Sequence, residues 1–89
     1  MIQQPLDIIN KLGLHARAAS KFVKLASSFQ SEIRLRKGER EANGKSIMGV
    51  MMLAASCGTR LELLIDGQDE QLALVALQEL VGNKFGEGE

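Results

Sequence analysis

Four stretches of the chain are predicted to be strands. Three of them place apolar residues on one side of an extended backbone, which is the pattern of strands with one buried face, and the third in order is a short charged segment that follows a turn. The four stretches cover residues 2–9, 32–37, 39–43 and 60–66. The last stretch is the clearest, because Leu61, Leu63 and Ile65 share one face. Pro5 has no N–H to donate, so the first strand either lies at an edge of the sheet or begins its pairing after this residue. The charged residues of the third stretch predict another edge strand.

Three other stretches repeat apolar residues every three or four positions, as amphipathic helices do. They cover residues 16–29, 47–55 and 69–81. Ser46 precedes the second helix as a natural N-cap, and Gly58 follows it as the terminating residue. Cys57 is expected to be a small buried apolar residue. The tail beyond residue 81 is rich in glycine and acidic residues, and we expect it to fray.

The order of elements is therefore β-α-β-β-α-β-α, and 89 residues suffice for one domain with a single core. Strands with apolar faces need a second layer, which amphipathic helices can supply on one face of an antiparallel sheet. We therefore predict an α+β fold over residues 1–89. It is a two-layer open-faced sandwich in which three helices cover one face of a four-stranded sheet and the other face meets solvent.

Charge and composition exclude several kinds of partner. The chain has 11 Lys and Arg residues against 11 Asp and Glu residues, so no net field attracts nucleic acid or acidic membranes. Three Phe and no Tyr or Trp supply few platforms for stacking bases. The single cysteine cannot form an internal disulfide, which is typical of a reducing compartment. With no signal-peptide pattern and no apolar run of about 20 residues, we expect a cytoplasmic protein that does not enter the membrane.

The candidate chemistry lies at residues 11–17, where a turn leads into the first helix. Gly13 allows a sharp turn, and His15, the only histidine, falls at or next to the helix start. There the first N–H groups lack intrahelical partners and the helix dipole is positive, so the site favours phosphate. Arg17 adds a charged planar fork that fits phosphate oxygens. A lone histidine is more often structural, but this combination predicts an imidazole that carries a phosphoryl group.

No nearby carboxylate, metal-binding cluster or nucleotide-binding glycine loop accompanies His15 in the sequence. Hydrolytic and metal chemistry therefore have no support, and we expect neither a metal nor a cofactor. The phosphoryl group must then come from another protein.

Two motifs resemble a known family. The run Gly-Leu-His-Ala-Arg-Ala-Ala at residues 13–19 resembles the active-site signature of HPr, the small phosphocarrier of the bacterial phosphoenolpyruvate-dependent phosphotransferase system. The run Asn-Gly-Lys-Ser-Ile-Met-Gly-Val-Met-Met-Leu-Ala at residues 43–54 resembles the family's regulatory-serine segment. Ala18 stands where the family usually has proline, which softens the helix start without removing a reactive group.

The resemblance spans the whole chain and implies the strand order 1-4-2-3, with the first strand at an edge. The methionine-rich segment and the Gly-Glu-Gly-Glu tail are similar to those of proteobacterial HPr proteins, which include nitrogen-branch relatives that often serve regulation. A monomer is expected.

The resemblance also implies a function. His15 is expected to accept a phosphoryl group from phosphorylated enzyme I and to pass it to a histidine of an enzyme IIA component, with Arg17 beside the phosphoryl group. The protein is then a co-substrate rather than an enzyme. The resemblance implies Nδ1 as the phosphorylated atom, whereas the residues alone do not distinguish the two ring nitrogens.

Ser46 has two interpretations. An N-cap role explains it completely, while the resemblance implies regulation through phosphorylation by an HPr kinase/phosphorylase. The helix after it is apolar on both sides, which indicates a second partner for its outer side, although some of its methionines could fill gaps in the core. The resemblance implies a docking surface around His15 that contains Ser20, Lys24, Lys45, Ile47, Met48 and Met51.

Two other functions remain open. A regulatory binding module could use the same surface without turning over phosphate, but an intact His15 argues against it. A small-ligand-binding domain that dimerises through its sheet would require a pocket, and it leaves the combination of His15 and Arg17 unexplained.

Overall fold

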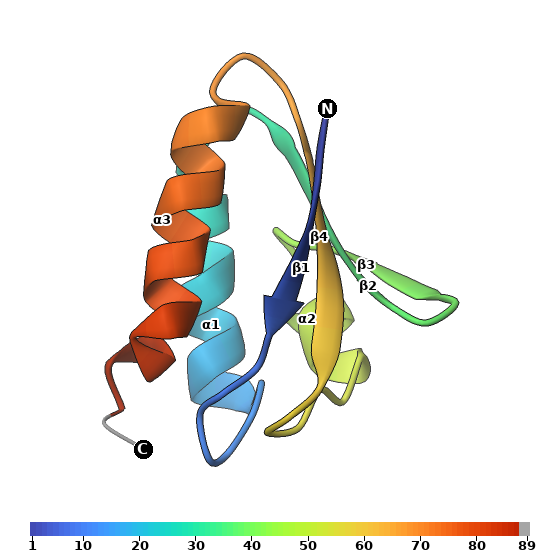
Figure 1. Cartoon of the computed structure of the whole chain (residues 1–89), viewed down its shortest axis with the longest axis vertical. Coiled ribbons are helices and arrows are strands. Elements are labelled where there is room, and N and C mark those ends of the chain that lie inside the picture. The colour runs from blue at the N-terminus through green and yellow to red at the C-terminus, as the bar shows by residue number, and fades with distance from the viewer. Residues whose placement is uncertain (88–89) are drawn as a thin grey trace.

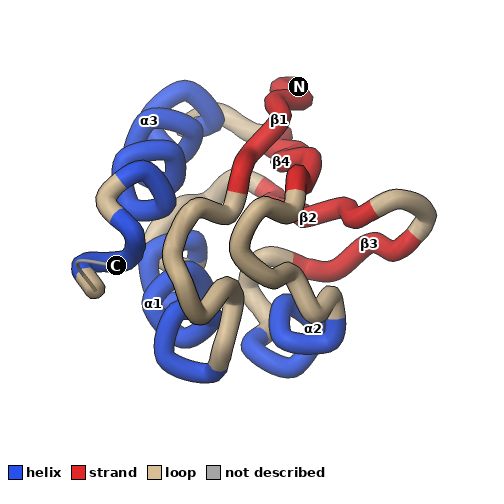
Figure 2. The backbone as a smooth tube through the Cα atoms, turned by 60° about the horizontal axis from the view of Figure 1, so that its bottom comes forward, coloured by secondary structure: helices blue, strands red, loops and turns tan. Residues whose placement is uncertain are grey.

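A computed structural model describes residues 1–87 and shows two layers, a sheet and the helices that cover one of its faces (Figures 1 and 2). The strands are β1 (Ile2–Asp7), β2 (Glu32–Lys37), β3 (Arg40–Asn43) and β4 (Arg60–Asp66). The helices are α1 (Ala16–Ala26), α2 (Ile47–Met52), α3 (Glu70–Gly82) and a short 3₁₀ helix, η1 (Lys84–Gly86). The predicted order of the seven main elements is confirmed.

The sheet has the predicted order, β1-β4-β2-β3, and every neighbouring pair is antiparallel. The strand that contains Pro5 lies at one edge and the short charged strand β3 at the other, as the sequence predicts. The inward residues Leu61, Leu63 and Ile65 of β4 are fully buried beneath the helices.

The open face of the sheet is polar. Arg34 pairs with Glu41 across β2 and β3, with 3.0 Å between the guanidinium nitrogen and the carboxylate oxygen. Arg36 of β2 lies 3.2 Å from Glu62 of β4. This face therefore meets solvent through charged side chains, as expected.

The first helix ends at Ala26, whereas the prediction extended it to residue 29. Serines compete for the last carbonyl groups: the Ser28 hydroxyl donates to the Leu25 oxygen at 2.6 Å, and the Ser28 N–H bonds the same oxygen at 3.0 Å. These bonds tighten the last turn and end the helix. Phe29 still packs against the core from the following turn.

The second helix is also shorter than predicted and ends at Met52 instead of residue 55. Ala54 adopts a left-handed backbone conformation with φ of 51°, which no α-helix can continue. Lys37 of β2 donates to the Leu53 carbonyl at 3.1 Å and to the Ala54 carbonyl at 3.2 Å, so a cation caps this end. Ala55, which the prediction included in the helix on its outer side, therefore lies beyond the helix end and is buried.

Two smaller expectations need correction. The first strand ends at Asp7 and not at residue 9, because the chain turns away from the sheet after Ile8 bonds the Thr59 carbonyl at 2.9 Å. Cys57 is exposed, not buried, because it follows the left-handed turn that ends α2 and lies in the loop before β4.

The tail was expected to fray, but its residues 82–87 are ordered, and Gly88 lies outside the described residues. Lys84, Phe85 and Gly86 all have positive φ, of 54°, 55° and 75°, so the chain turns back sharply after α3. The Phe85 side chain is 1 % exposed, and the Lys21 ammonium of α1 donates to its carbonyl at 2.6 Å. Burial of one aromatic ring offsets the conformational cost of this turn.

Within residues 1–87, no helix combines the length and the apolar character needed to cross a membrane.

Candidate functional site

His15 lies at the N-cap of α1, where its backbone is extended and its carbonyl accepts the Ala19 N–H at 2.8 Å. Its side chain is 28 % exposed and makes no capping bond, so the ring is available for chemistry. The preceding turn requires Gly13, whose φ is 68°. The next N–H, that of Leu14, donates at 2.8 Å to the Ala55 carbonyl and ties the turn to the segment after α2.

A carboxylate from the far end of the chain contacts the histidine ring. The Nε2 atom of His15 lies 2.5 Å from Oε2 of Glu87. The other carboxylate oxygen, Oε1, accepts a hydrogen bond of 3.0 Å from the fully buried side chain of Asn10, which also donates to the Gly13 carbonyl at 2.8 Å. The expectation that no carboxylate accompanies His15 is therefore wrong.

The Glu87 carboxylate is charged at neutral pH. Burial raises the pKa of this group, but hydrogen bonds from Asn10 and then from His15 outweigh that effect. Electrostatic interactions with the His15 ring and with the Lys21 ammonium act in the same direction, and the pKa lies below its ordinary value. Because an ionised carboxylate can only accept, Nε2 is the donor in this contact.

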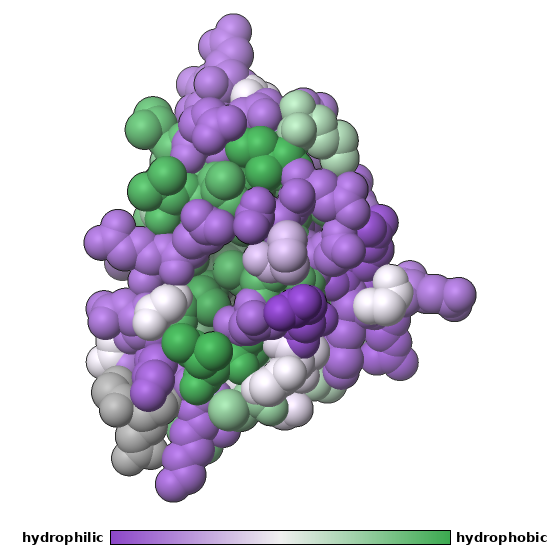
Figure 3. All heavy atoms as spheres, in the orientation of Figure 1, coloured by the Kyte–Doolittle hydropathy of each residue, from purple (hydrophilic) through white to green (hydrophobic). Residues whose placement is uncertain are grey.

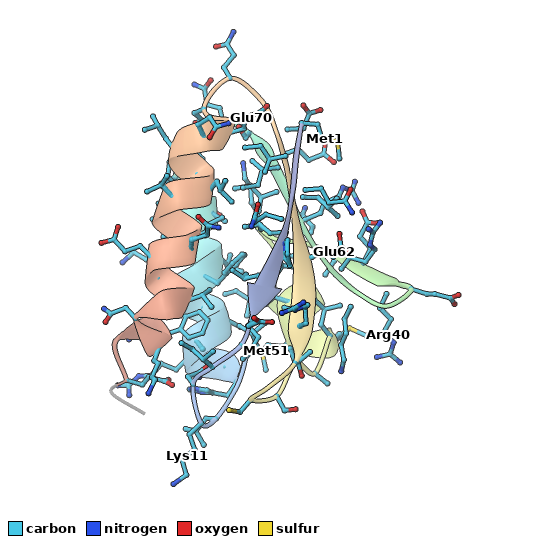
Figure 4. The ribbon with its side chains drawn as sticks, in the orientation of Figure 1. Met1, Lys11, Arg40, Met51, Glu62 and Glu70 are labelled. Atoms are coloured by element: carbon cyan, nitrogen blue, oxygen red, sulfur yellow. The ribbon has the colours of Figure 1, made fainter. Side chains whose placement is uncertain are left out.

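The second ring nitrogen, Nδ1, makes no hydrogen bond within the described part of the chain. A shallow cleft of about 300 Å³ borders the ring and is lined by Lys11, Leu12, His15, Arg17, Gly86 and Glu87. Figure 4 shows Lys11 on the loop before α1, at the end of the molecule where this cleft lies. Arg17 thus shares an exposed cleft with His15, as its position in the first helical turn predicts.

The apolar outer side of α2 is exposed. Met48 and Met52 are each 69 % exposed, Ile47 is 43 % and Met51 is 38 % exposed. The alternative that Met52 fills a gap in the core is therefore wrong. The helix packs beside α1 (Figure 2), so these side chains lie on the same end of the molecule as the loop before α1.

The polar residues predicted around this surface differ in what they do. Ser20 and Lys24 are exposed on α1. Lys45 is half-buried, and its ammonium donates to the Phe29 carbonyl at 2.7 Å. Lys45 therefore links the segment before α2 to the end of α1 in addition to contributing charge.

Ser46 is the N-cap of α2, as predicted: its backbone is extended and its Oγ accepts the Gly49 N–H at 3.2 Å. The structure gives this serine a complete local role. It is half-buried next to the exposed Ile47, so a group added to its hydroxyl would adjoin the apolar side of α2.

A second apolar area lies away from His15. Figure 3 shows apolar atoms over α3 and along the seam between α3 and β1, flanked by polar side chains. Leu72 and Val75 of α3 are 69 % and 59 % exposed. Among residues 1–87, no group of three or more His, Cys, Asp or Glu side chains could hold a metal ion.

The sequence did not predict that Glu87 and Asn10 belong to the site around His15. One signal was present, because Phe85 is an isolated apolar residue in an otherwise polar tail and indicates an anchor. Nothing local connects such an anchor, or Glu87 two residues after it, with a histidine 72 positions before that glutamate.

The fold is that of a small phosphocarrier. A family model described as "PTS HPr component phosphorylation site" matches residues 2–83. The chain belongs to the HPr family, the phosphocarrier proteins of the phosphotransferase system. HPr carries a phosphoryl group and is not itself a catalyst, and its partners belong to that system. The interpretation as a small-ligand-binding domain loses its support.

Relatives match over the full length. The phosphocarrier protein HPr of Neisseria meningitidis is 56 % identical over 89 residues and covers 100 % of both chains. That of Cupriavidus necator is 53 % identical over the same span, again covering 100 % of both. A crystal structure of HPr from Thermoanaerobacter tengcongensis superimposes with a TM-score of 0.94 at 46 % identity and covers 98 % of each chain.

Proposed function

We propose that His15 accepts a phosphoryl group from phosphorylated enzyme I and passes it to a histidine of an enzyme IIA component. One observation carries this proposal: the His15 ring lies at the start of α1 beside an open cleft, with Nε2 held by Glu87 and Nδ1 without a hydrogen bond among the described residues. An imidazole nitrogen with a free lone pair is a competent phosphoryl acceptor.

The surroundings favour a bound phosphoryl group. The first N–H groups of α1 and the positive end of its dipole attract the phosphoryl oxygens. Arg17 is exposed in the same cleft and supplies a planar donor for those oxygens. Transfer between two imidazoles needs little else, because positioning and charge stabilisation supply most of the acceleration of phosphoryl transfer.

We assign docking of both partners to the surface around His15 that the sequence predicts. The exposed side chains of Ile47, Met48 and Met51 supply apolar contacts that adapt to more than one partner. Ser20 and Lys24 on α1 and Lys45 before α2 add polar and positively charged contacts, which favour acidic partner surfaces.

The proposal predicts a phosphorylated form of this protein. Intact-protein mass spectrometry after incubation with enzyme I and phosphoenolpyruvate is expected to show a single phosphoryl adduct that acid removes. Addition of an enzyme IIA component should then discharge the adduct. If a competent enzyme I leaves the protein unmodified, the regulatory module that turns over no phosphate becomes the better interpretation.

We further propose that phosphorylation of Ser46 by an HPr kinase/phosphorylase regulates this exchange. The hydroxyl adjoins the exposed Ile47 at the start of α2. A phosphate there adds about two negative charges beside the docking surface and weakens binding of acidic partners.

The variants Ser46→Asp and Ser46→Ala separate charge from helix capping. Aspartate caps a helix as well as serine does but adds a negative charge, whereas alanine removes the cap at a cost of about 1 kcal/mol. We expect the aspartate variant to accept phosphate from enzyme I several-fold more slowly, and the alanine variant to react at the unmodified rate. Equal rates in both variants would contradict regulation by charge at this position.

A further inference from the structure

We propose that Glu87 is a positioning residue for phosphoryl transfer: it holds Nε2–H of His15 and leaves Nδ1 as the nucleophile. This inference rests on the proposed role of His15 as the phosphoryl acceptor. The contact joins the ring to a tail residue 72 positions away, with 2.5 Å between Nε2 and Oε2.

The backbone conformation and packing of the tail hold the Glu87 carboxylate in place. Three successive residues with positive φ, at positions 84–86, reverse the chain after α3. The Phe85 side chain is then buried in the core at 1 % exposure, and Lys21 of α1 holds its carbonyl at 2.6 Å. Non-glycine residues adopt this backbone only where packing enforces it, so the direction of the chain at Glu87 is determined by the core.

The carboxylate is also fixed from its other side. Asn10 is fully buried and donates from one amide nitrogen to Oε1 of Glu87 at 3.0 Å and to the Gly13 carbonyl at 2.8 Å. One side chain therefore ties the tail to the turn that carries His15. Both carboxylate oxygens have a partner, and the ring cannot rotate without breaking the Nε2 contact.

This contact selects the reactive nitrogen. A neutral imidazole carries one N–H and one lone pair, and the nitrogen that faces an ionised carboxylate keeps the hydrogen. Nε2 is thus protonated and Nδ1 has the lone pair. In the transfer step, the Nδ1 lone pair forms the bond to phosphorus. The donor phosphohistidine's nitrogen–phosphorus bond breaks, and its electron pair returns to the donor ring.

The carboxylate also stabilises the ring as it reacts. When Nδ1 bonds to phosphorus and Nε2 keeps its proton, positive charge develops on the His15 ring. Glu87 faces that charge at the nitrogen that does not react, so the two negative groups contact different ring atoms. A fixed opposite charge at a developing charge lowers the barrier, as in other carboxylate–histidine pairs.

The test compares Glu87→Ala with Glu87→Gln and with a matched control, Glu79→Ala. Alanine removes the acceptor, glutamine keeps a hydrogen-bond acceptor without the charge, and Glu79 is an exposed glutamate of α3 away from the cleft. Two readouts are measured at neutral pH. One is the NMR signal of the His15 Nε2 proton, and the other is the steady-state rate of phosphorylation by enzyme I.

For Glu87→Ala we expect the Nε2 proton signal to be lost to exchange with water. We also expect kcat for phosphoryl acceptance to fall about tenfold with an unchanged KM. Glu87→Gln should keep the proton signal and lose about threefold in kcat, and Glu79→Ala should behave as the unmodified protein. Thermal unfolding checks that all variants are folded.

Three results would overturn the inference. They are an unchanged kcat in Glu87→Ala, a retained Nε2 proton signal in that variant, and a change confined to KM, which indicates docking instead of positioning. If the unmodified protein itself forms no adduct, the proposed function fails, and this inference fails with it. If the unmodified protein forms the adduct but any of the three results is found, the proposed function stands and only the role of Glu87 is overturned.

Discussion

Replacement of His15 by alanine is expected to abolish the phosphoryl adduct completely. The chain contains one histidine, so no second imidazole can take over. The fold should survive, because the ring is 28 % exposed and contributes no capping bond to α1. We expect the free energy of unfolding to change by at most about 1 kcal/mol. Mass spectrometry after treatment with enzyme I and phosphoenolpyruvate measures the first effect, and thermal unfolding the second.

Arg17→Ala is the matched variant for this prediction. It removes the proposed phosphate contact but keeps the nucleophile, so the adduct should still form, more slowly. An adduct that persists in His15→Ala would place the chemistry at another residue. Equal rates for Arg17→Ala and the unmodified protein would show that Arg17 does not contribute to phosphoryl acceptance.

Gly13→Ala is expected to be the most disruptive small substitution near the site. A Cβ at this position would lie 2.5 Å from the Ala55 carbonyl oxygen and 2.8 Å from the Ser56 Cα, both of which are backbone atoms. The residue also has φ of 68°, which disfavours alanine. Clash and strain together should lower the free energy of unfolding by about 3 kcal/mol. Because the turn must move, we also expect slower phosphoryl acceptance at His15.

Gly38→Ala supplies the control for Gly13→Ala. Gly38 has a similar φ of 61°, but a Cβ there meets no atom within 4 Å. This variant should lose only about 1 kcal/mol, from backbone strain alone, and react normally with enzyme I. Denaturant unfolding of both variants measures the difference. Equal losses would show that the close approach of the turn to residues 55–56 does not matter.

The sequence predicted most of the fold because its information is local. Apolar residues with periods of two and of three to four identified most strands and the helices, and Pro5 favoured an edge position as one of two interpretations, which the sheet order confirms. The strand order itself followed from the resemblance to HPr. Helix ends were less accurate, since the Ser28 hydroxyl at the end of α1 and the left-handed Ala54 after α2 are decided by individual hydrogen bonds and contacts.

The candidate site, like the fold, was predicted from the sequence only where it depends on neighbouring residues. Gly13, His15 and Arg17 lie close together in the sequence, and their spacing at a helix start predicts phosphate chemistry. By itself, the sequence thus determined the elements and their order and predicted a turn suited to phosphate, since each depends on residues a few positions apart.

The tertiary structure alone decided which ring nitrogen is held. Glu87 reaches His15 because burial of Phe85 and the bond from Lys21 fold the tail back against α1, while Asn10 binds the carboxylate from the other side. A contact across 72 positions depends on how the helices pack on the sheet and leaves no periodic trace in the chain.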